Sequence, residues 1–449
     1  MLLTILATVL VLGVLVFVHE LGHFVTAKLA DIKVPRFSIG LGPKAWGFTV
    51  GETEYVLSWI PLGGYVKMAG MEELDHVEGG SEPDARAAGP GPGPRDFDGK
   101  PVGSRAIVIS AGVIMNMLFA FFLYALMAVI WGVGLNPDSR LGRVSLDELP
   151  VGADELADVP MGTRILAVGD KEVSRWTDVL NAIALAPAGP VTLRFEGGEA
   201  VTIELPSDDE ERGDLIGALD PVVDPVVGSV LEGGAAQEAG LEPDDRIVSV
   251  DGEPTPLWED LVETVSARPG QTIAMVVERD GVPRTVRITP REAIRVSSDG
   301  DSTVVGLIGI GLPERRPGPL GAIAHGASET WRWTGFTLDV LKGLVTGGVS
   351  ARNVGGPILI GQLSGRVARA GLEPLFAFMA LLSINLAIFN ILPIPVLDGG
   401  QLVFLAVEAI RGRALSLEQR IRFSQVGMVI LMALIVLVMA NDVLRLLGV

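Results

Sequence analysis

The chain has 449 residues, of which 49% are hydrophobic and 20% are charged, and it contains no cysteine. Its mean hydropathy of +0.45 is too high for an ordinary soluble enzyme. The lack of cysteine excludes disulfides, thiolate catalysis and cysteine-ligated metal sites. A net charge of −19 argues against a nucleic-acid binder, which would need a basic surface to neutralise phosphates.

Four segments carry no charged residue and are long enough to cross a bilayer as helices, namely 1–18, 106–137, 374–397 and 423–441. The first lacks the preceding basic residues and the small-residue cleavage pattern of a signal peptide, so we expect it to be retained. The sequence therefore predicts a polytopic α-helical membrane protein with four transmembrane helices.

The acidic charge is confined to one region, because residues 138–314 carry 14 basic and 35 acidic side chains. This pattern indicates a water-soluble module inserted between the second and third helices. The loop 28–105 holds nine basic residues, and the third connection holds Arg411, Arg413, Arg420 and Arg422. Because positive charge favours the cytoplasmic side, these two loops are expected there, and the module and both termini are expected outside the cytoplasm.

The segment 36–68 alternates apolar residues with glycines, which predicts a β-hairpin beside the first helix. The Gly-Pro-rich, acidic stretch that follows is typical of a flexible linker. In chain order, we expect a first helix (1–30), a membrane-reentrant hairpin (31–70), a cytoplasmic linker (71–104), a second helix (105–136), two inserted domains (138–221 and 222–295), a connecting amphipathic segment (296–372), a third helix (373–410), and a loop with the fourth helix (411–449).

The two inserted domains are predicted from an internal repeat. Residues 162–170 align without a gap with residues 244–252, and Trp176 aligns with Trp258. Each copy has alternating strands, a turn and an amphipathic helix, an order that resembles a circularly permuted bacterial PDZ domain. The first copy lacks the Ala-Gly-Leu turn of the second, so its peptide groove is the less well supported. The two copies could bind or gate peptides, or act only as spacers.

The first helix ends in the sequence His19-Glu20-Leu21-Gly22-His23. Residues four apart share one face of a helix, so both imidazoles can bind one metal ion while Glu20 faces a bound water. Zinc suits this set, because two neutral imidazoles leave room for a carboxylate and a water. Ionisable groups at membrane depth are costly, which favours a functional site over a solvated helix end.

The third span supplies the missing ligand. Pro393 and Pro395 cannot continue a regular helix, and freed carbonyls inside a membrane require a protein or water-filled surrounding. Asp398, which follows this break, is the lone carboxylate available there. We therefore expect it to complete the metal site.

These motifs together resemble the site-2 protease family. The resemblance includes the His-Glu-x-x-His helix, the Pro61-Leu-Gly-Gly-Tyr-Val-Lys-Met68 run, the Asn-x-x-Pro-x-Pro-x-Leu-Asp-Gly run and the two PDZ-like domains. One difference is that Val113 stands where the family commonly has proline before the asparagine of the second span, here Asn116.

The resemblance implies a zinc-dependent intramembrane endopeptidase of the bacterial inner membrane, acting in regulated intramembrane proteolysis. Its zinc ligands would be His19, His23 and Asp398, and Glu20 would be the base. Its substrate would be a single-span membrane protein, an anti-sigma factor or a remnant signal peptide, already cut by another protease. The hairpin would receive the substrate as an added strand. The implied substrate-binding residues are Asn385, Asn390, Gly40, Gly42, Gly63, Gly64 and Tyr65.

Two other functions remain open from the sequence. A membrane-bound PDZ scaffold with a degenerate site would bind little zinc, although all four catalytic residues are intact. A metal transporter would need further carboxylates or histidines along the spans, and the sequence has none.

Overall fold

The computed structural model describes residues 1–71, 93–146, 149–296, 302–347, 349 and 354–447. The chain forms two compact units. The membrane unit comprises Met1–Trp131, Gly318–Lys342 and Ser350–Val449, and the inserted unit comprises Gly132–Pro317 and Gly343–Val349. Most of the expected linker, residues 72–92, lies outside the described residues.

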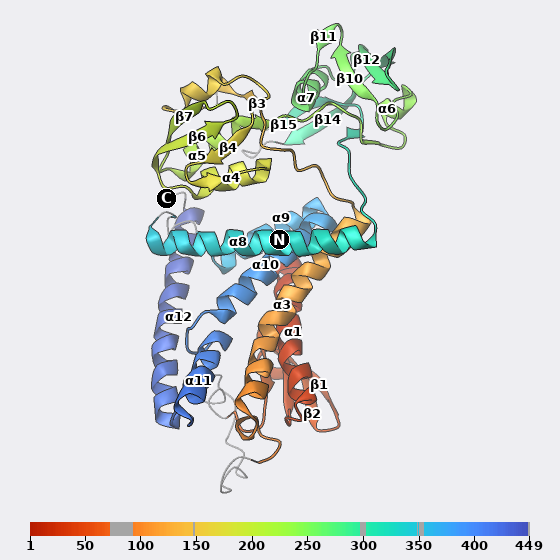
Figure 1. The fold of residues 1–449 in the computed structure, drawn as a ribbon. Helices are drawn as coiled ribbons and strands as arrows, with labels where there is room; N and C mark the ends of the chain where they lie inside the picture. Colours follow the sequence, from red (N-terminus) through yellow and green to blue (C-terminus); the bar gives the residue numbers. More distant parts are fainter. Residues whose placement is uncertain (72–92, 147–148, 297–301, 348, 350–353, 448–449) are drawn as a thin grey trace. The chain divides into compact units, whose positions relative to one another are not determined.

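The described part of the membrane unit contains four helices that are long and apolar enough to cross a bilayer, which agrees in number with the four predicted spans. Helices α1, α3 and α10 pack around a buried apolar core that includes Val11, Leu15, Leu123 and Ile384. In Figure 1 these helices and α12 form the red-to-blue bundle. The bounds are Leu2–Leu29 for α1, Val102–Ile130 for α3, Leu372–Ile391 for α10 and Leu417–Leu446 for α12.

The expected connecting segment is largely helical. It contains α8 (Pro319–Thr346) and α9 (Pro357–Ala370). Gly326 of α8 packs so closely on α3 that an added Cβ would lie 2.8 Å from the carbonyl oxygen of Phe121, and Thr337 of α8 donates a hydrogen bond to Asn385 of α10. The helix α8 therefore crosses the bundle and contacts both α3 and α10 (Figure 1).

The third span is broken where the prolines predict it. Helix α10 ends at Ile391, and α11 (Asp398–Arg411) begins after the segment that contains Pro393 and Pro395. Val396 in this segment has a φ of 101°, a conformation that strains a β-branched residue. The break therefore frees Asp398 to begin a new helix.

A two-stranded hairpin follows α1. Its strands are β1 (Arg36–Val50) and β2 (Thr53–Lys67). The start of β1 pairs on both sides, since Phe37 is opposite Val66 on one side and opposite Tyr55 on the other. The end of β2 (residues 64–67) therefore pairs with one edge of the start of β1, and the beginning of β2 (residues 54–57) pairs with the other edge.

The inserted unit contains two four-stranded antiparallel sheets of the same order, β5-β4-β6-β7 and β11-β10-β12-β13. Each sheet packs against a helix and forms one lobe of the inserted unit with it. The first lobe contains α4 (Trp176–Leu185), and the second lobe contains α7 (Trp258–Ser266). The first-lobe elements also include β3 (Leu141–Val144), η3 (Asp154–Asp158), β4 (Ile165–Val168), β5 (Lys171–Glu172), β6 (Gly189–Phe195), β7 (Ala200–Leu205), α5 (Asp209–Gly217) and β8 (Leu219–Pro221). The second-lobe elements include β9 (Ser229–Val230), α6 (Ala235–Glu238), β10 (Arg246–Val250), β11 (Glu253–Pro254), β12 (Ile273–Arg279), β13 (Val282–Ile288), β14 (Arg291–Val296), β15 (Ser302–Leu307) and β16 (Ile310–Gly311).

The second lobe runs past residue 295, the end expected from the sequence. Ile308 belongs to its buried core, and Ile310 in β16 pairs with Val230 in β9. The repeat alignment could not place these residues, because they have no counterpart in the repeated motif. The two ends of the inserted unit are held together, since Val133 and Arg315 exchange two backbone hydrogen bonds of 2.8 and 3.0 Å.

Candidate metal centre

The end of α1 brings His19 and His23 onto one buried helix face, with exposed fractions of 8% and 7%. Their Nε2 atoms lie 3.2 Å apart. The same face carries Val11, Leu15 and Val18, which are buried against neighbouring helices. The helical repeat therefore places both imidazoles inside the bundle.

Asp398 begins α11 and reaches the two imidazoles from the other side of the bundle. Its Oδ2 atom lies 3.2 Å from Nε2 of His19 and 3.4 Å from Nε2 of His23. This oxygen is buried and has no hydrogen-bond partner among the described residues. The structure thus brings the three predicted ligands together.

The three atoms fit a zinc ion. Bonds of about 2.0–2.1 Å at a tetrahedral angle separate neighbouring ligand atoms by roughly 3.3 Å. The observed separations of 3.2, 3.2 and 3.4 Å match this value. His19, His23 and Asp398 form the one such cluster of three found in the described residues.

Helix α3 orients both imidazoles. Nδ1 of His23 lies 2.8 Å from the carbonyl oxygen of Val108, to which it donates, so its Nε2 lone pair is available to a metal. Nδ2 of Asn116 lies 3.2 Å from Nδ1 of His19. Its Oδ1 is buried without a hydrogen-bond partner in the described chain. A half-turn of this amide would let Nδ1–H of His19 donate to Oδ1 and leave Nε2 free for the metal.

Two glycines make room for this arrangement. A Cβ at Gly112 of α3 would lie 2.6 Å from Cε1 and 2.8 Å from Nε2 of His19. A Cβ at Gly22 of α1 would lie 2.7 Å from Cγ of Met115. The close approach of α1 and α3, and hence the placement of the imidazoles, requires glycine at both positions.

A cavity of about 240 Å³ opens beside the cluster. It is lined by Glu20 and Asn390, and by Gly63, Gly64 and Tyr65 of β2. Nδ2 of Asn390 lies 3.4 Å from Nε2 of His19. A Cβ at Gly64 would lie 3.1 Å from Cγ of Glu20, so glycine allows this strand to pass close to the carboxylate.

Three of the predicted substrate-binding residues do not line this cavity. The amide oxygen of Asn385 accepts a hydrogen bond of 2.8 Å from Thr337 of α8. Gly40 and Gly42 lie in β1 with positive φ values of 88° and 86°. The sequence does not predict the roles of Asn116, Val108 and Gly112 around the imidazoles. A lone amide in an apolar span could have indicated the first, but a backbone carbonyl and a packing glycine leave no sequence signal.

Comparisons with known proteins agree with this chemistry. The model of Peptidase family M50 matches residues 7–434. Regulator of sigma-E protease RseP from Escherichia coli (strain K12) is 35% identical over 463 residues, which cover 98% of each chain. Protease RseP from Yersinia pestis is 33% identical over 461 residues, again 98% of each chain. A Ralstonia nicotianae chain named as a candidate zinc metalloprotease is 33% identical over 476 residues, 99% of each.

Proposed function

Because this chain belongs to peptidase family M50 and is a zinc metallopeptidase, we propose that His19, His23 and Asp398 bind its zinc ion and that Glu20 is the general base. The observation that carries the proposal is the convergence of three buried ligand atoms, at 3.2 to 3.4 Å from one another. A metal ion would also satisfy Oδ2 of Asp398, which has no hydrogen-bond partner among the described residues.

The side chains around the cavity supply the remaining chemistry. A bound zinc ion supplies Lewis acidity and lowers the pKa of water towards about 7. Glu20 lines the cavity with the ligands, so its carboxylate can take the proton from water and return it to the leaving amine. Asn390 lines the same cavity and can donate to a substrate carbonyl. The volume of about 240 Å³ is enough for several waters at roughly 30 Å³ each.

The substrate binds as an extended strand. A helical transmembrane segment hides its carbonyls in its own hydrogen bonds, so it must unwind before hydrolysis. The end of β2 pairs with β1 on one side, and Gly63, Gly64 and Tyr65 line the cavity. A substrate strand added along this end of β2 would carry its scissile bond past Glu20.

The hairpin itself lies in the membrane, and its side chains support this. Trp46 and Trp59 have exposed fractions of 64% and 72%, and exposed tryptophans are enriched where proteins meet the headgroup region. Gly40 and Gly42 bend β1, and Asn385, held by Thr337, stays a predicted substrate contact from α10. These residues would shape the path by which the strand enters.

The biological substrate is a single-span membrane protein that another protease has already shortened. The Escherichia coli relative carries a name that refers to regulation of sigma-E, which supports an anti-sigma factor, with a remnant signal peptide as the other substrate. The basic loops orient the protein in the bacterial inner membrane with the inserted unit outside the cytoplasm. The inserted unit would then exclude substrates with large exterior domains.

The test uses the purified full chain and a model single-span substrate, with cleavage followed by mass spectrometry. Wild type should contain about one zinc, which His23→Phe should lose. Glu20→Gln should keep the zinc and lose cleavage, because an amide cannot accept the water proton. Full zinc in His23→Phe, or activity of Glu20→Gln near that of wild type, would refute the assigned roles. Wild-type zinc near zero would support a scaffold with a degenerate site.

A further inference from the structure

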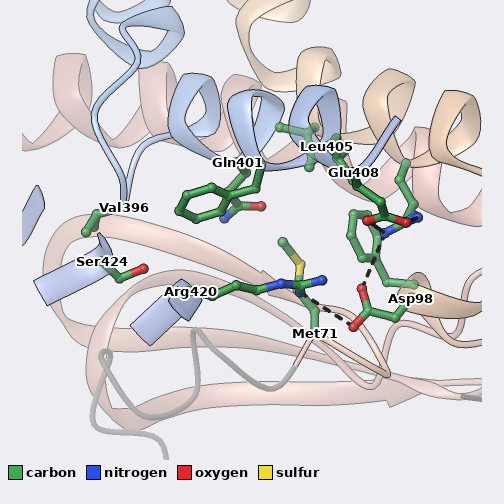
Figure 2. A pocket seen from close by; sticks show the side chains of 12 residues that line it. Met71, Asp98, Val396, Gln401, Leu405, Glu408, Arg420 and Ser424 are labelled. Carbon is green, nitrogen blue, oxygen red and sulfur yellow. Dashed lines mark hydrogen bonds and ion pairs between the residues drawn. The ribbon is translucent and has the colours of Figure 1, made fainter. Parts of the chain in front are cut away.

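Four charged side chains meet at one end of α3, α11 and α12, outside the proposed ligand set. They are Arg105 of α3, Glu408 of α11, Arg420 of α12 and Asp98, which precedes α3. Figure 2 shows Asp98, Glu408 and Arg420 around a small pocket that Arg105 also lines, with dashed lines for hydrogen bonds and ion pairs. Some residues of this pocket also line the cavity of the metal centre, namely Met71, Ile109, Val396 and Gln401.

The central pair is Arg105 with Glu408. The guanidinium donates through Nη1 to Oε2 at 3.0 Å and through Nη2 to Oε1 at 2.5 Å. Its Nε donates to the carbonyl oxygen of Lys100 at 3.0 Å. Arg105 is only 4% exposed. The planar fork thus fixes Glu408 in both position and direction.

Burial of this pair is weak evidence for a gain in stability. Desolvation of two charges offsets most of their attraction, and an apolar pair of similar volume is often as stable. A pair that joins residues 303 positions apart does, however, define how two helices are placed on each other. That placement is the property relevant to the metal centre.

Helix α11 joins this pair to the third ligand. Asp398 is its first residue and Glu408 lies ten residues later, roughly 15 Å along the helix axis. At the Asp398 end, Gly400 packs so closely on the broken segment that a Cβ would lie 2.6 Å from Cα of Pro395. At the other end, Glu408 is held by Arg105. The helix is therefore fixed at both ends.

Helix α3 is the common frame for all three ligands. It presents the carbonyl of Val108 to His23 and the amide of Asn116 to His19. Through Arg105 it also fixes α11, which carries Asp398. Arg420 of α12 and Asp98 form an ion pair of 3.7 Å, so α12 also contacts the segment that precedes α3.

We propose that Arg105 and Glu408 are positioning residues of the metal centre, which set α11 on α3 so that Asp398 meets both imidazoles. This inference rests on the proposed ligand assignment. A shift of α11 of even a few tenths of an ångström would exceed the tolerance of about 0.2 Å in metal–ligand distances. Loss of the fork should therefore weaken metal binding although no ligand is changed.

The experiment measures zinc affinity of the purified full chain by chelator competition, and the visible spectrum of the Co²⁺-loaded protein. Arg105→Lys keeps the charge and removes the fork. The double variant Arg105→Met with Glu408→Leu removes both charges and leaves neither unpaired. The matched control is Arg422→Lys, in a pair with Glu418 whose side chains are both 75% exposed.

Both Arg105 variants should bind zinc about tenfold more weakly, the lower end of the effect of groups that orient metal ligands. Their Co²⁺ bands should be weaker or shifted, and Arg422→Lys should match wild type. Wild-type affinity and an unchanged Co²⁺ spectrum in either folded Arg105 variant would overturn the inference. His23→Phe distinguishes failure of the ligand assignment from failure of the positioning role. If it retains zinc, the ligand assignment fails and this inference with it; if it loses zinc while the Arg105 variants do not, only the positioning role fails.

Discussion

Substitution of Gly112 by alanine tests whether the metal centre depends on the close packing of α1 against α3. Gly112 lies within α3 and faces both imidazoles. An added Cβ would lie closest to Nε2 of His23, and 2.6 Å from Cε1 and 2.8 Å from Nε2 of His19. Ordinary contact between such atoms requires about 3.5 Å or more. The imidazole of His19 must therefore move by roughly 0.7 to 0.9 Å and that of His23 by more, or the two helices must separate.

Neither movement is compatible with the site. Metal–ligand distances tolerate about 0.2 Å, and this shift is several times larger. Loss of a group that orients a metal ligand lowers affinity about 10- to 100-fold, and we expect Gly112→Ala to lower zinc affinity by at least as much. The stability of α3 should not fall, because alanine is favoured over glycine in a helix by about 1 kcal/mol. The variant should therefore remain folded and lose zinc.

Zinc affinity by chelator competition, together with helix content by circular dichroism, measures the two effects separately. Gly103→Ala is the matched control, since Gly103 lies in the same helix and a Cβ there would meet no atom within 4 Å. The control should bind zinc as wild type does. A folded Gly112→Ala protein with wild-type zinc affinity and cleavage would show that the site does not depend on this contact.

Further predictions concern the orienting amide, a helix cap, a buried carboxylate and the inserted unit. Asn116→Ala should lower zinc affinity about 10- to 100-fold, as measured by chelator competition; unchanged affinity would refute a role in orienting His19. The buried carboxylate of Asp442 accepts backbone hydrogen bonds of 2.8, 2.9 and 3.2 Å at the start of α9, so Asp442→Ala should lower the free energy of unfolding by about 1–3 kcal/mol, seen as a lower thermal midpoint in detergent. Burial raises the pKa of Asp245, but its hydrogen bonds from Arg279 and a backbone N–H outweigh burial and bring the pKa below the ordinary value. The stabilisation from ionised Asp245 is thus present above about pH 4 and is lost as the pH falls through the lower folded-state pKa. Asp245→Asn should therefore lower the thermal midpoint at pH 7, and this difference from wild type should shrink below about pH 4. A difference that grows on acidification would contradict this. Because hydrogen bonds join the two ends of the inserted unit, residues 134–314 can be replaced by a short linker, and this variant should cleave untrimmed substrates that wild type rejects; the same preference for trimmed substrates in both would count against a size filter.

The sequence predicted those parts of the fold and site that depend on local pattern. The four spans follow from runs of uncharged residues, and the break before Asp398 follows from Pro393 and Pro395. The spacing of His19 and His23 places both on one face of a helix. The family, the zinc dependence and the proteolytic activity that these motifs implied are confirmed by the match to family M50 and the named relatives.

Other features could not be read from the sequence, because they join residues that no local period relates. The sequence gives no register for the hairpin, in which the start of β1 pairs on both sides. It does not place residues 302–311 in the second lobe, because the repeated motif ends before them. It also does not reveal that the amide oxygen of Asn385, which stays a predicted substrate contact, accepts a hydrogen bond from Thr337 of α8.

The amino-acid sequence by itself predicted which residues should carry the chemistry, since helical spacing, the proline break and membrane hydropathy are properties of short segments. Only the tertiary structure decided what holds those residues in place: Val108 and Asn116 against the imidazoles, Gly112 in the space between the helices, and Arg105 against Glu408. The physical reason is that a segment's period determines which side chains share a face, whereas steric fit and hydrogen bonding between distant segments determine which faces meet.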